Sequence, residues 1–147
     1  MIRILIHYIG NFLRFVYLSK LRLLGVSIGK NTMISMGAKI DTHRGKIKIG
    51  DNCLITSGVF ILSHDGASRM IDFDDLGNGE VIIGNNVFIG VNSVILKNVK
   101  IGDNSVIGAG SVINKDIPPC SLVVGNPGRI IKTLEGPFPI LNDHKTH

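Results

Sequence analysis

The clearest pattern along the chain is an isoleucine that recurs every six residues. A small or β-branched residue often stands four positions later, as Val59 does after Ile55 and Ser93 after Ile89. No α-helix has a period of six, whereas a strand has a period of two, of which six is a multiple. Each hexad therefore predicts a short strand and a turn, with both of these residues facing inward. The lattice consists of Ile28, Ile34, Ile40, Ile49, Ile55, Ile61, Ile83, Ile89, Ile95, Ile101, Ile107 and Ile113.

Three consecutive hexads are long enough for one turn of a triangular coil. Coils stacked at roughly the strand spacing of 4.8 Å would align equivalent residues in ladders along the inside of a prism. A sandwich of short hairpins would instead show turn signals about every 8–12 residues and no strict period of six. The predicted coils are 28–45, 49–66, 83–100 and 101–118.

Two insertions interrupt the period, and both follow the third hexad of a coil. Three residues are added before Ile49 and sixteen before Ile83. Both insertions are therefore expected to leave the prism at the same corner, where excursions from a regular scaffold often carry function. The longer one, residues 65–82, is either a lid or acceptor-binding loop over a site, or a solvated surface loop.

The first 24 residues are strongly apolar but are interrupted by Arg3, His7, Arg14, Lys20 and Arg22. These charges argue against a spanning helix, and no small-residue cleavage site indicates a secretory signal. The segment is either a helix that caps the open end of the prism, which we favour, or a helix lying on a membrane surface. The predicted regions are a helical cap at 1–24, a β-helix at 25–118 and a C-terminal extension at 119–147.

Composition narrows the class of protein. A chain of 147 residues with 44% hydrophobic and 18% charged residues can bury the core of one domain and is not a disordered tail. Two cysteines make no disulfide scaffold, which favours a cytoplasmic protein. The net charge of +5 suits an anionic small ligand but is too small to indicate nucleic acid binding.

Residues 28–118 resemble the hexapeptide-repeat acyltransferase family, and in particular its short sugar or polysaccharide O-acetyltransferases. The family motif is an aliphatic residue, glycine, two variable residues, a small residue and one more, and residues 125–132 resemble the family's ending after the last coil. The resemblance implies an all-β, left-handed parallel β-helix with an N-terminal helix and a short C-terminal extension. It also implies a homotrimer, acetyl-coenzyme A as co-substrate, and a catalytic histidine at a corner loop.

His64 stands at the base of the long insertion. An imidazole with a pKa near 6.5 is neutral enough at physiological pH to accept a proton from an attacking hydroxyl or amine. Sugar-modifying members place their base 27 residues before the coil position that is Val91 here, so the resemblance implies that His64 is the general base. Asp65 either orients His64 or is a turn residue.

His43 lies three residues after Ile40, as His64 does after Ile61, so register alone can stack the two histidines on adjacent coils. It is a second acceptor-binding group, a member of a metal pair or an exposed turn residue. Zinc would need a third histidine, so no metal is expected. The predicted acceptor-binding residues are Ser35, Asp41 and His43.

The acyl donor is long and anionic. Its phosphates require cations, and its arm can pair with backbone along a coil edge lined by small residues, such as 108–111. A solvated basic face is the alternative for the cations. By resemblance, the donor-contacting positions are Ala109, Asn114, Lys115, Arg129 and Lys132.

We therefore expect an acetyl-coenzyme A-dependent O- or N-acetyltransferase that acts on a sugar of a surface polysaccharide or a nucleotide sugar. It is expected to be cytoplasmic, with a possible peripheral membrane contact through residues 1–24. A serine acetyltransferase-like enzyme is less favoured, because the long helical N-terminal domain usual in such enzymes does not precede the coils. A non-catalytic trimeric scaffold of the same fold is the third alternative.

Overall fold

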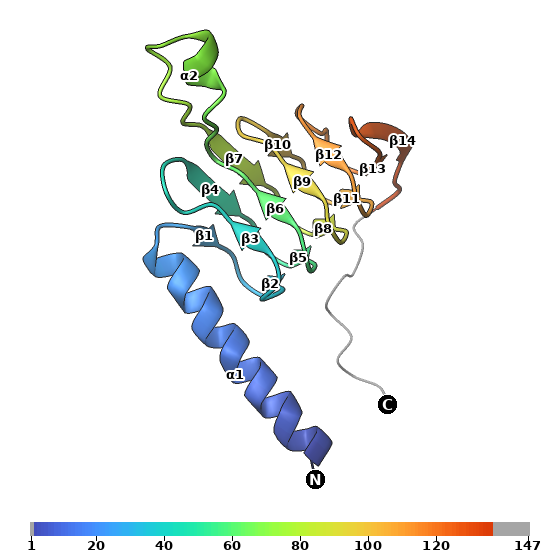
Figure 1. Ribbon diagram of the computed structural model, residues 1–147. Helices are drawn as coiled ribbons and strands as arrows, with labels where there is room; N and C mark the ends of the chain where they lie inside the picture. Colours follow the sequence, from blue (N-terminus) through green and yellow to red (C-terminus); the bar gives the residue numbers. More distant parts are fainter. Residues whose placement is uncertain (1, 137–147) are drawn as a thin grey trace.

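The computed structural model describes residues 2–136, and their side chains from residue 6 onward. A long helix, α1 (Ile2–Leu23), precedes a triangular prism of short strands, and one short helix, α2 (Ser68–Ile71), lies in the long insertion (Figure 1). The strands form three sheets, so the prism has three faces. Pairing is parallel within each face, except that β14 runs antiparallel to β13.

Each face takes one strand from each coil, and the faces are named here in the order in which the chain enters them. Face A contains β1 (Ser27–Ile28), β4 (Lys46–Ile49), β7 (Glu80–Ile83) and β10 (Lys100–Ile101). Face B contains β2 (Met33–Ile34), β5 (Leu54–Ile55), β8 (Phe88–Ile89), β11 (Val106–Ile107), β13 (Ser121–Val124) and β14 (Arg129–Thr133). Face C contains β3 (Lys39–Ile40), β6 (Phe60–Ile61), β9 (Val94–Ile95) and β12 (Val112–Ile113).

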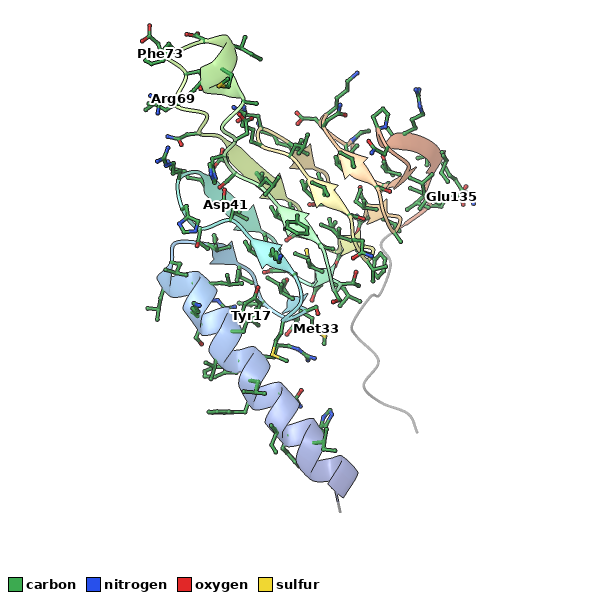
Figure 2. All side chains as sticks on the ribbon, viewed as in Figure 1. Tyr17, Met33, Asp41, Arg69, Phe73 and Glu135 are labelled. Atoms are coloured by element: carbon green, nitrogen blue, oxygen red, sulfur yellow. The ribbon has the colours of Figure 1, made fainter. Side chains whose placement is uncertain are left out.

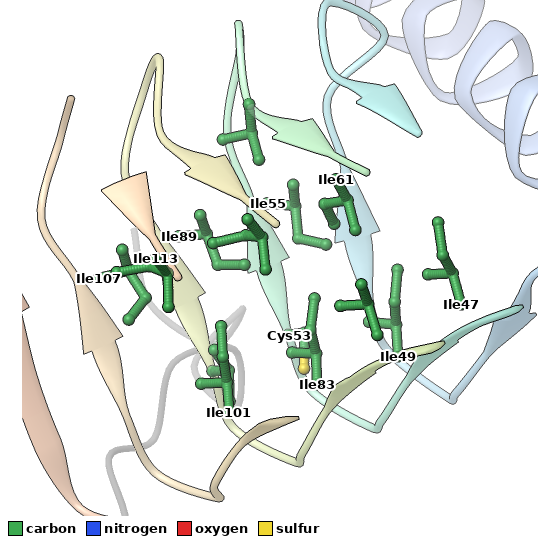
Figure 3. Close-up of a cluster of buried hydrophobic side chains, with 14 of the residues drawn as sticks. Ile47, Ile49, Cys53, Ile55, Ile61, Ile83, Ile89, Ile101, Ile107 and Ile113 are labelled. Carbon is green, nitrogen blue, oxygen red and sulfur yellow. The ribbon is translucent and has the colours of Figure 1, made fainter. Parts of the chain in front are cut away.

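The isoleucine lattice forms three ladders inside the prism, one along each face (Figure 3). On face B, for example, Ile55 pairs with both Ile34 and Ile89, and all three side chains are fully buried. The predicted small residues are buried as well, including Val59 and Ser93. The predicted register and the predicted parallel β-helix are therefore confirmed.

Glycine after the lattice isoleucine is required by the close stacking of the coils. A Cβ atom at Gly50 would lie 2.6 Å from the carbonyl oxygen of Gly84, and one at Gly90 would lie 2.6 Å from the backbone nitrogen of Ala109. Neither approach is tolerable, because the obstructing atoms belong to backbone that cannot move aside. The glycines thus let the corners of successive coils stack at strand spacing.

The C-terminal half of α1 packs against the prism. Leu21 is buried against the first coil, Leu18 is partly buried, and the Tyr17 hydroxyl donates a 2.8 Å hydrogen bond to the carbonyl of Ala38 (Figure 2). The N-terminal turns extend away from the prism (Figure 1). Within residues 2–136, no helix combines the length and the apolar character that crossing a membrane requires.

Both insertions leave the prism between faces C and A, at an edge called here the C–A corner. The short one joins β3 to β4, and the long one, which contains α2, joins β6 to β7 and projects outward (Figure 1). The edge between faces B and C is called the B–C corner. The coils are regular there, so excursions from the scaffold gather on one side of the molecule.

Candidate active site

Asp41 and His64 meet at the C–A corner. Asp41 directly follows β3, and His64 stands three residues after the end of β6, which pairs with β3. Their side chains are joined by a hydrogen bond between Nδ1 of His64 and Oδ2 of Asp41. The Asp41 side chain is 5% exposed, and that of His64 is 35% exposed, so the imidazole can be reached from outside while the carboxylate is covered.

Three further hydrogen bonds hold the Asp41 carboxylate in place. The backbone N–H and the hydroxyl of Ser63 donate to Oδ2 at 3.1 and 2.9 Å, and the backbone N–H of His43 donates to Oδ1 at 3.1 Å. Burial favours the neutral acid, but the hydrogen bonds from His64, His43 and Ser63 outweigh it and lower the pKa of Asp41 to about 2. Asp41 is therefore ionised near neutral pH.

The ionised state of Asp41 fixes the tautomer of His64. A carboxylate can only accept, so Nδ1 of His64 must donate the shared hydrogen bond. In the neutral ring, Nε2 then carries the lone pair and is the basic nitrogen. The arrangement can take up a proton at Nε2, and a buried negative charge would stabilise the imidazolium that results.

Asp65 holds the base of the long insertion and makes no contact of this kind with the His64 ring. Its Oδ1 accepts a 2.8 Å hydrogen bond from the backbone N–H of Ser68, and its Oδ2 lies 3.1 Å from Nζ of Lys97. The bonds from Ser68 and then the contact with Lys97 lower the pKa of Asp65 to about 2. Between the two aspartates, the structure thus places Asp41 in the orienting position that was considered for Asp65.

Lys97 ties the insertion to the third coil and was not singled out from the sequence. Besides Asp65, its Nζ contacts the hydroxyl of Ser68 and lies 3.9 Å from Oδ2 of Asp75. Its side chain is only 17% exposed. The sequence offered one weak signal, which is that Lys97 follows the third lattice isoleucine of its coil, level with the insertion. A solvated lysine at a turn looks the same in a sequence.

A pocket of about 220 Å³ lies beside His64. Leu62 and Leu96 give it apolar walls, whereas Lys97 and Asn114 add polar groups. Asn114 is the predicted donor-contacting residue that joins His64 in this pocket, and Lys115 follows it at the same corner. A reacting group bound here would be within reach of the imidazole and partly shielded from water.

Of the remaining predicted residues, His43 lies next to Asp41, and the others lie farther from the Asp41–His64 pair. His43 is exposed, and it contacts Asp41 through its backbone. Ser35 lies at the B–C corner, where it lines a separate pocket of about 430 Å³ beneath Arg14 of α1. Three predicted donor-contacting residues also lie away from His64: Ala109 stands at the B–C corner, and Arg129 and Lys132 belong to β14 of face B.

A metal centre needs several ligating side chains in one place. Among the residues that the structure describes, no three or more His, Cys, Asp or Glu side chains are grouped so as to hold a metal ion. Cys53 is buried in the core and Cys120 is half-buried, and both are free thiols. The chemistry that the C–A corner offers is therefore proton transfer by the Asp41–His64 pair.

Two family models match the repeats. Residues 80–115 match the bacterial transferase hexapeptide model of six repeats, and residues 47–63 match the hexapeptide repeat of succinyl-transferase. Both matches lie within the coils. They agree with the predicted left-handed β-helix.

Similar proteins include enzymes whose structures are solved. The chain is 41% identical to protein CapG of Staphylococcus aureus over 110 residues, which cover 75% of this chain and 54% of CapG. A hexapeptide-repeat acetyltransferase of Vibrio cholerae, solved with acetyl-coenzyme A, is 35% identical with a TM-score of 0.66, covering 76% of this chain and 62% of that one. A maltose O-acetyltransferase of Clostridium difficile 630 is 37% identical with a TM-score of 0.62, covering 79% of this chain and 73% of that one.

The matches do not extend over the full length of every relative. The chain spans about half the length of CapG and 62% of the Vibrio cholerae enzyme. It covers nearly three quarters of the Clostridium difficile enzyme, at 37% identity.

Proposed function

Because the chain belongs to the hexapeptide-repeat acetyltransferases, we propose that it transfers an acetyl group from acetyl-coenzyme A to a hydroxyl or amine of a sugar. His64 is the general base of this reaction, and Asp41 orients it. The observation that carries the proposal is the bond from Nδ1 of His64 to the ionised, buried Asp41, which leaves Nε2 free to act beside a pocket.

The proposed reaction is direct attack on the thioester. The acceptor oxygen or nitrogen forms a bond to the acetyl carbonyl carbon while Nε2 of His64 takes the acceptor's proton. The bond between this carbon and the coenzyme A sulfur then breaks. The leaving thiolate receives the proton from the imidazolium, so the products are acetylated acceptor and free coenzyme A thiol. Asp41 stabilises the imidazolium between these two steps.

The donor is acetyl-coenzyme A, which the solved Vibrio cholerae relative holds. Asn114 and Lys115 contact it near His64, and Arg129 and Lys132 bind its phosphates. Both of these cations belong to β14, whose residues are all exposed. A sugar acceptor is supported by the named activity of the Clostridium difficile relative. The acceptor sugar belongs to a surface polysaccharide or to a nucleotide sugar. The reaction takes place in the cytoplasm, where the two free thiols of Cys53 and Cys120 are expected to persist.

The working assembly is a homotrimer in which two chains share each active site. In one chain, His64 and Ala109 lie at opposite edges of face C. In a cyclic trimer, one surface of each chain packs against a different surface of the next chain. It can therefore place the B–C corner and β14 of one chain beside the C–A corner of the next.

The proposal is tested by incubating the full chain with acetyl-coenzyme A and a panel of sugars, and measuring the release of coenzyme A thiol. We expect release to depend on one class of sugar, and His64→Ala to cut turnover by at least about 100-fold while donor binding is retained. Equal loss of turnover and of donor binding in His64→Ala would remove the base role. A scaffold that has lost the chemistry would neither release thiol nor bind acetyl-coenzyme A.

A further inference from the structure

The outer side of α1 carries a stripe of large apolar side chains that the described part of the chain leaves uncovered. The outer stripe consists of Tyr8, Ile9, Phe12, Val16 and Leu23, which are between 48% (Val16) and 88% (Leu23) exposed. It is the centre of a wider apolar surface, because Ile6, Leu13 and Phe15 of the same helix are exposed as well. A soluble monomer rarely exposes such a continuous group of apolar side chains, so a stripe of this kind marks an interaction site.

The stripe faces away from the prism. Leu21 is the residue of α1 that is buried against the first coil. At about 100° per residue, Phe12 lies about 180° around the helix from Leu21, and the other stripe residues lie about 120–160° from it. The prism therefore cannot cover the stripe without rotating α1 and exposing Leu21. The N-terminal turns also extend beyond the prism, which leaves this side open along its length (Figure 1).

All the charged side chains of α1 are basic. Residues 2–23 contain Arg3, Arg14, Lys20 and Arg22 and no Asp or Glu, so they carry +4 of the chain's formal net charge of +5. The other residues contain twelve basic and eleven acidic side chains, which leaves +1. By helical position, Lys20 and Arg22 stand on the two sides of the outer stripe. An apolar stripe bordered by cations is complementary to a surface in which an apolar layer lies beneath negatively charged groups.

We propose that α1 docks the protein on an anionic membrane surface, with the outer stripe inserted at the boundary between headgroups and acyl chains. Helices of this type lie in the plane of the interface, and binding grows with both the buried apolar area and the attraction to anionic lipid. Lys20 can extend its aliphatic stem along the apolar boundary and hold its ammonium among the headgroups. At 22 residues α1 is long enough to span a membrane, but its interrupting charges leave it too polar to do so and suit an interfacial helix.

A second copy of the chain is a poorer occupant for the stripe. Two copies of α1 meeting along it would bring two sets of cations together with no acidic partner on either helix. Like charges brought close together are destabilising, and neither copy of α1 carries an acidic side chain to offset them. Anionic lipid supplies that charge and the apolar phase together.

Co-sedimentation of the full chain with vesicles tests the proposal. Two vesicle types are compared, phosphatidylcholine alone and equal parts of phosphatidylcholine and phosphatidylglycerol. We expect binding to the second type and little to the first, with affinity falling as salt is raised. Phe12→Glu should weaken binding about tenfold or more, whereas the matched control Asn11→Glu, which adds the same charge off the stripe, should weaken it far less.

Further measurements separate folding and self-association from lipid binding. Val16→Ser shortens the stripe without adding charge and should weaken binding a few-fold, while thermal melting reports whether each variant still folds. Equal binding to both vesicle types, no binding by the unaltered chain, or equal effects of Phe12→Glu and Asn11→Glu would overturn the proposal. A change of oligomeric state in Phe12→Glu without vesicles would assign the stripe to an interface between copies. Acetyl transfer is measured separately, so either proposal can fail alone.

Discussion

The Asp41 carboxylate accepts a hydrogen bond from Nδ1–H of His64 across two adjacent coils, and this bond sets the chemistry of the C–A corner. Ser63 and the backbone of His43 hold the carboxylate in turn, so the imidazole is oriented by a group that is itself fixed. Groups that act through such supporting contacts keep a catalytic side chain near its productive geometry. The same bond leads to predictions for both activity and stability.

Asp41→Asn should lower turnover by about 100-fold or more. An amide can donate to Nδ1, which favours the tautomer whose Nε2 carries the proton, and it does not stabilise the imidazolium. The KM for acetyl-coenzyme A should change little, because Asp41 lies away from the predicted phosphate-binding cations. Steady-state release of thiol across a pH series measures both effects. An unchanged turnover and pH profile would show that Asp41 has only a structural role.

Asp41→Asn should also make the free energy of unfolding fall less steeply as the pH is lowered. The folded state lowers the pKa of Asp41 from its ordinary value of 3.8 to about 2. This carboxylate therefore stabilises the fold fully above 3.8, and the stabilisation is lost as the pH falls towards about 2. Denaturant unfolding at several acidic pH values should show a shallower fall for Asp41→Asn than for the unaltered chain. Asp74→Asn, in the exposed loop, is the control that also removes one carboxylate.

Lys97→Met should loosen the long insertion without unfolding the prism. The substitution keeps an unbranched side chain but removes the contacts of Nζ with Asp65, Ser68 and Asp75. We expect faster amide exchange and proteolysis within residues 65–79, with little change in melting temperature. Lys100→Met, on an exposed position of face A, is the matched control. If amide exchange and proteolysis within residues 65–79 are the same in both variants, Lys97 does not anchor the insertion to the prism.

A shared active site predicts complementation between two inactive variants. His64→Ala removes the base, and Arg129→Ala weakens donor binding, so each should be nearly inactive alone. If each site takes His64 from one chain and Arg129 from its neighbour, random trimers from equal amounts of both variants restore about a quarter of the sites. Co-expression followed by an activity assay measures this recovery. No recovery, with mixed trimers verified by differing tags, would place both residues of a site in one chain.

The prism could be predicted from sequence because its stability depends on a strictly repeated requirement. Each lattice isoleucine fills the same narrow interior, so the spacing of these isoleucines along the chain predicts the register of the strands. The pairing of Ile49 with Ile83 is an example. His64 could be found as well, because it stands at the point where the period breaks. Its partner was harder to find, because Asp41 and Asp65 look alike in a sequence.

What separates the two aspartates is the stacking of coils. Asp41 is one coil away from His64 but adjacent in space, whereas Asp65 is adjacent in sequence but engaged by Ser68 and Lys97. Side-chain direction at an irregular corner has no period, so a repeat pattern cannot predict it. The helix α1 has a similar difficulty, because its apolar residues are readable from sequence but the side that meets the prism is not.

Thermal unfolding with and without saturating acetyl-coenzyme A tests the central claim most directly. A ligand at 100 times its Kd stabilises the native state by about 2.7 kcal/mol, which is about 5–10 °C for a domain of this size. We predict such a rise for the unaltered chain and for His64→Ala, and its loss in Arg129→Ala. No rise in the unaltered chain at a saturating dose would contradict the account, since a protein that does not bind the donor cannot transfer its acetyl group.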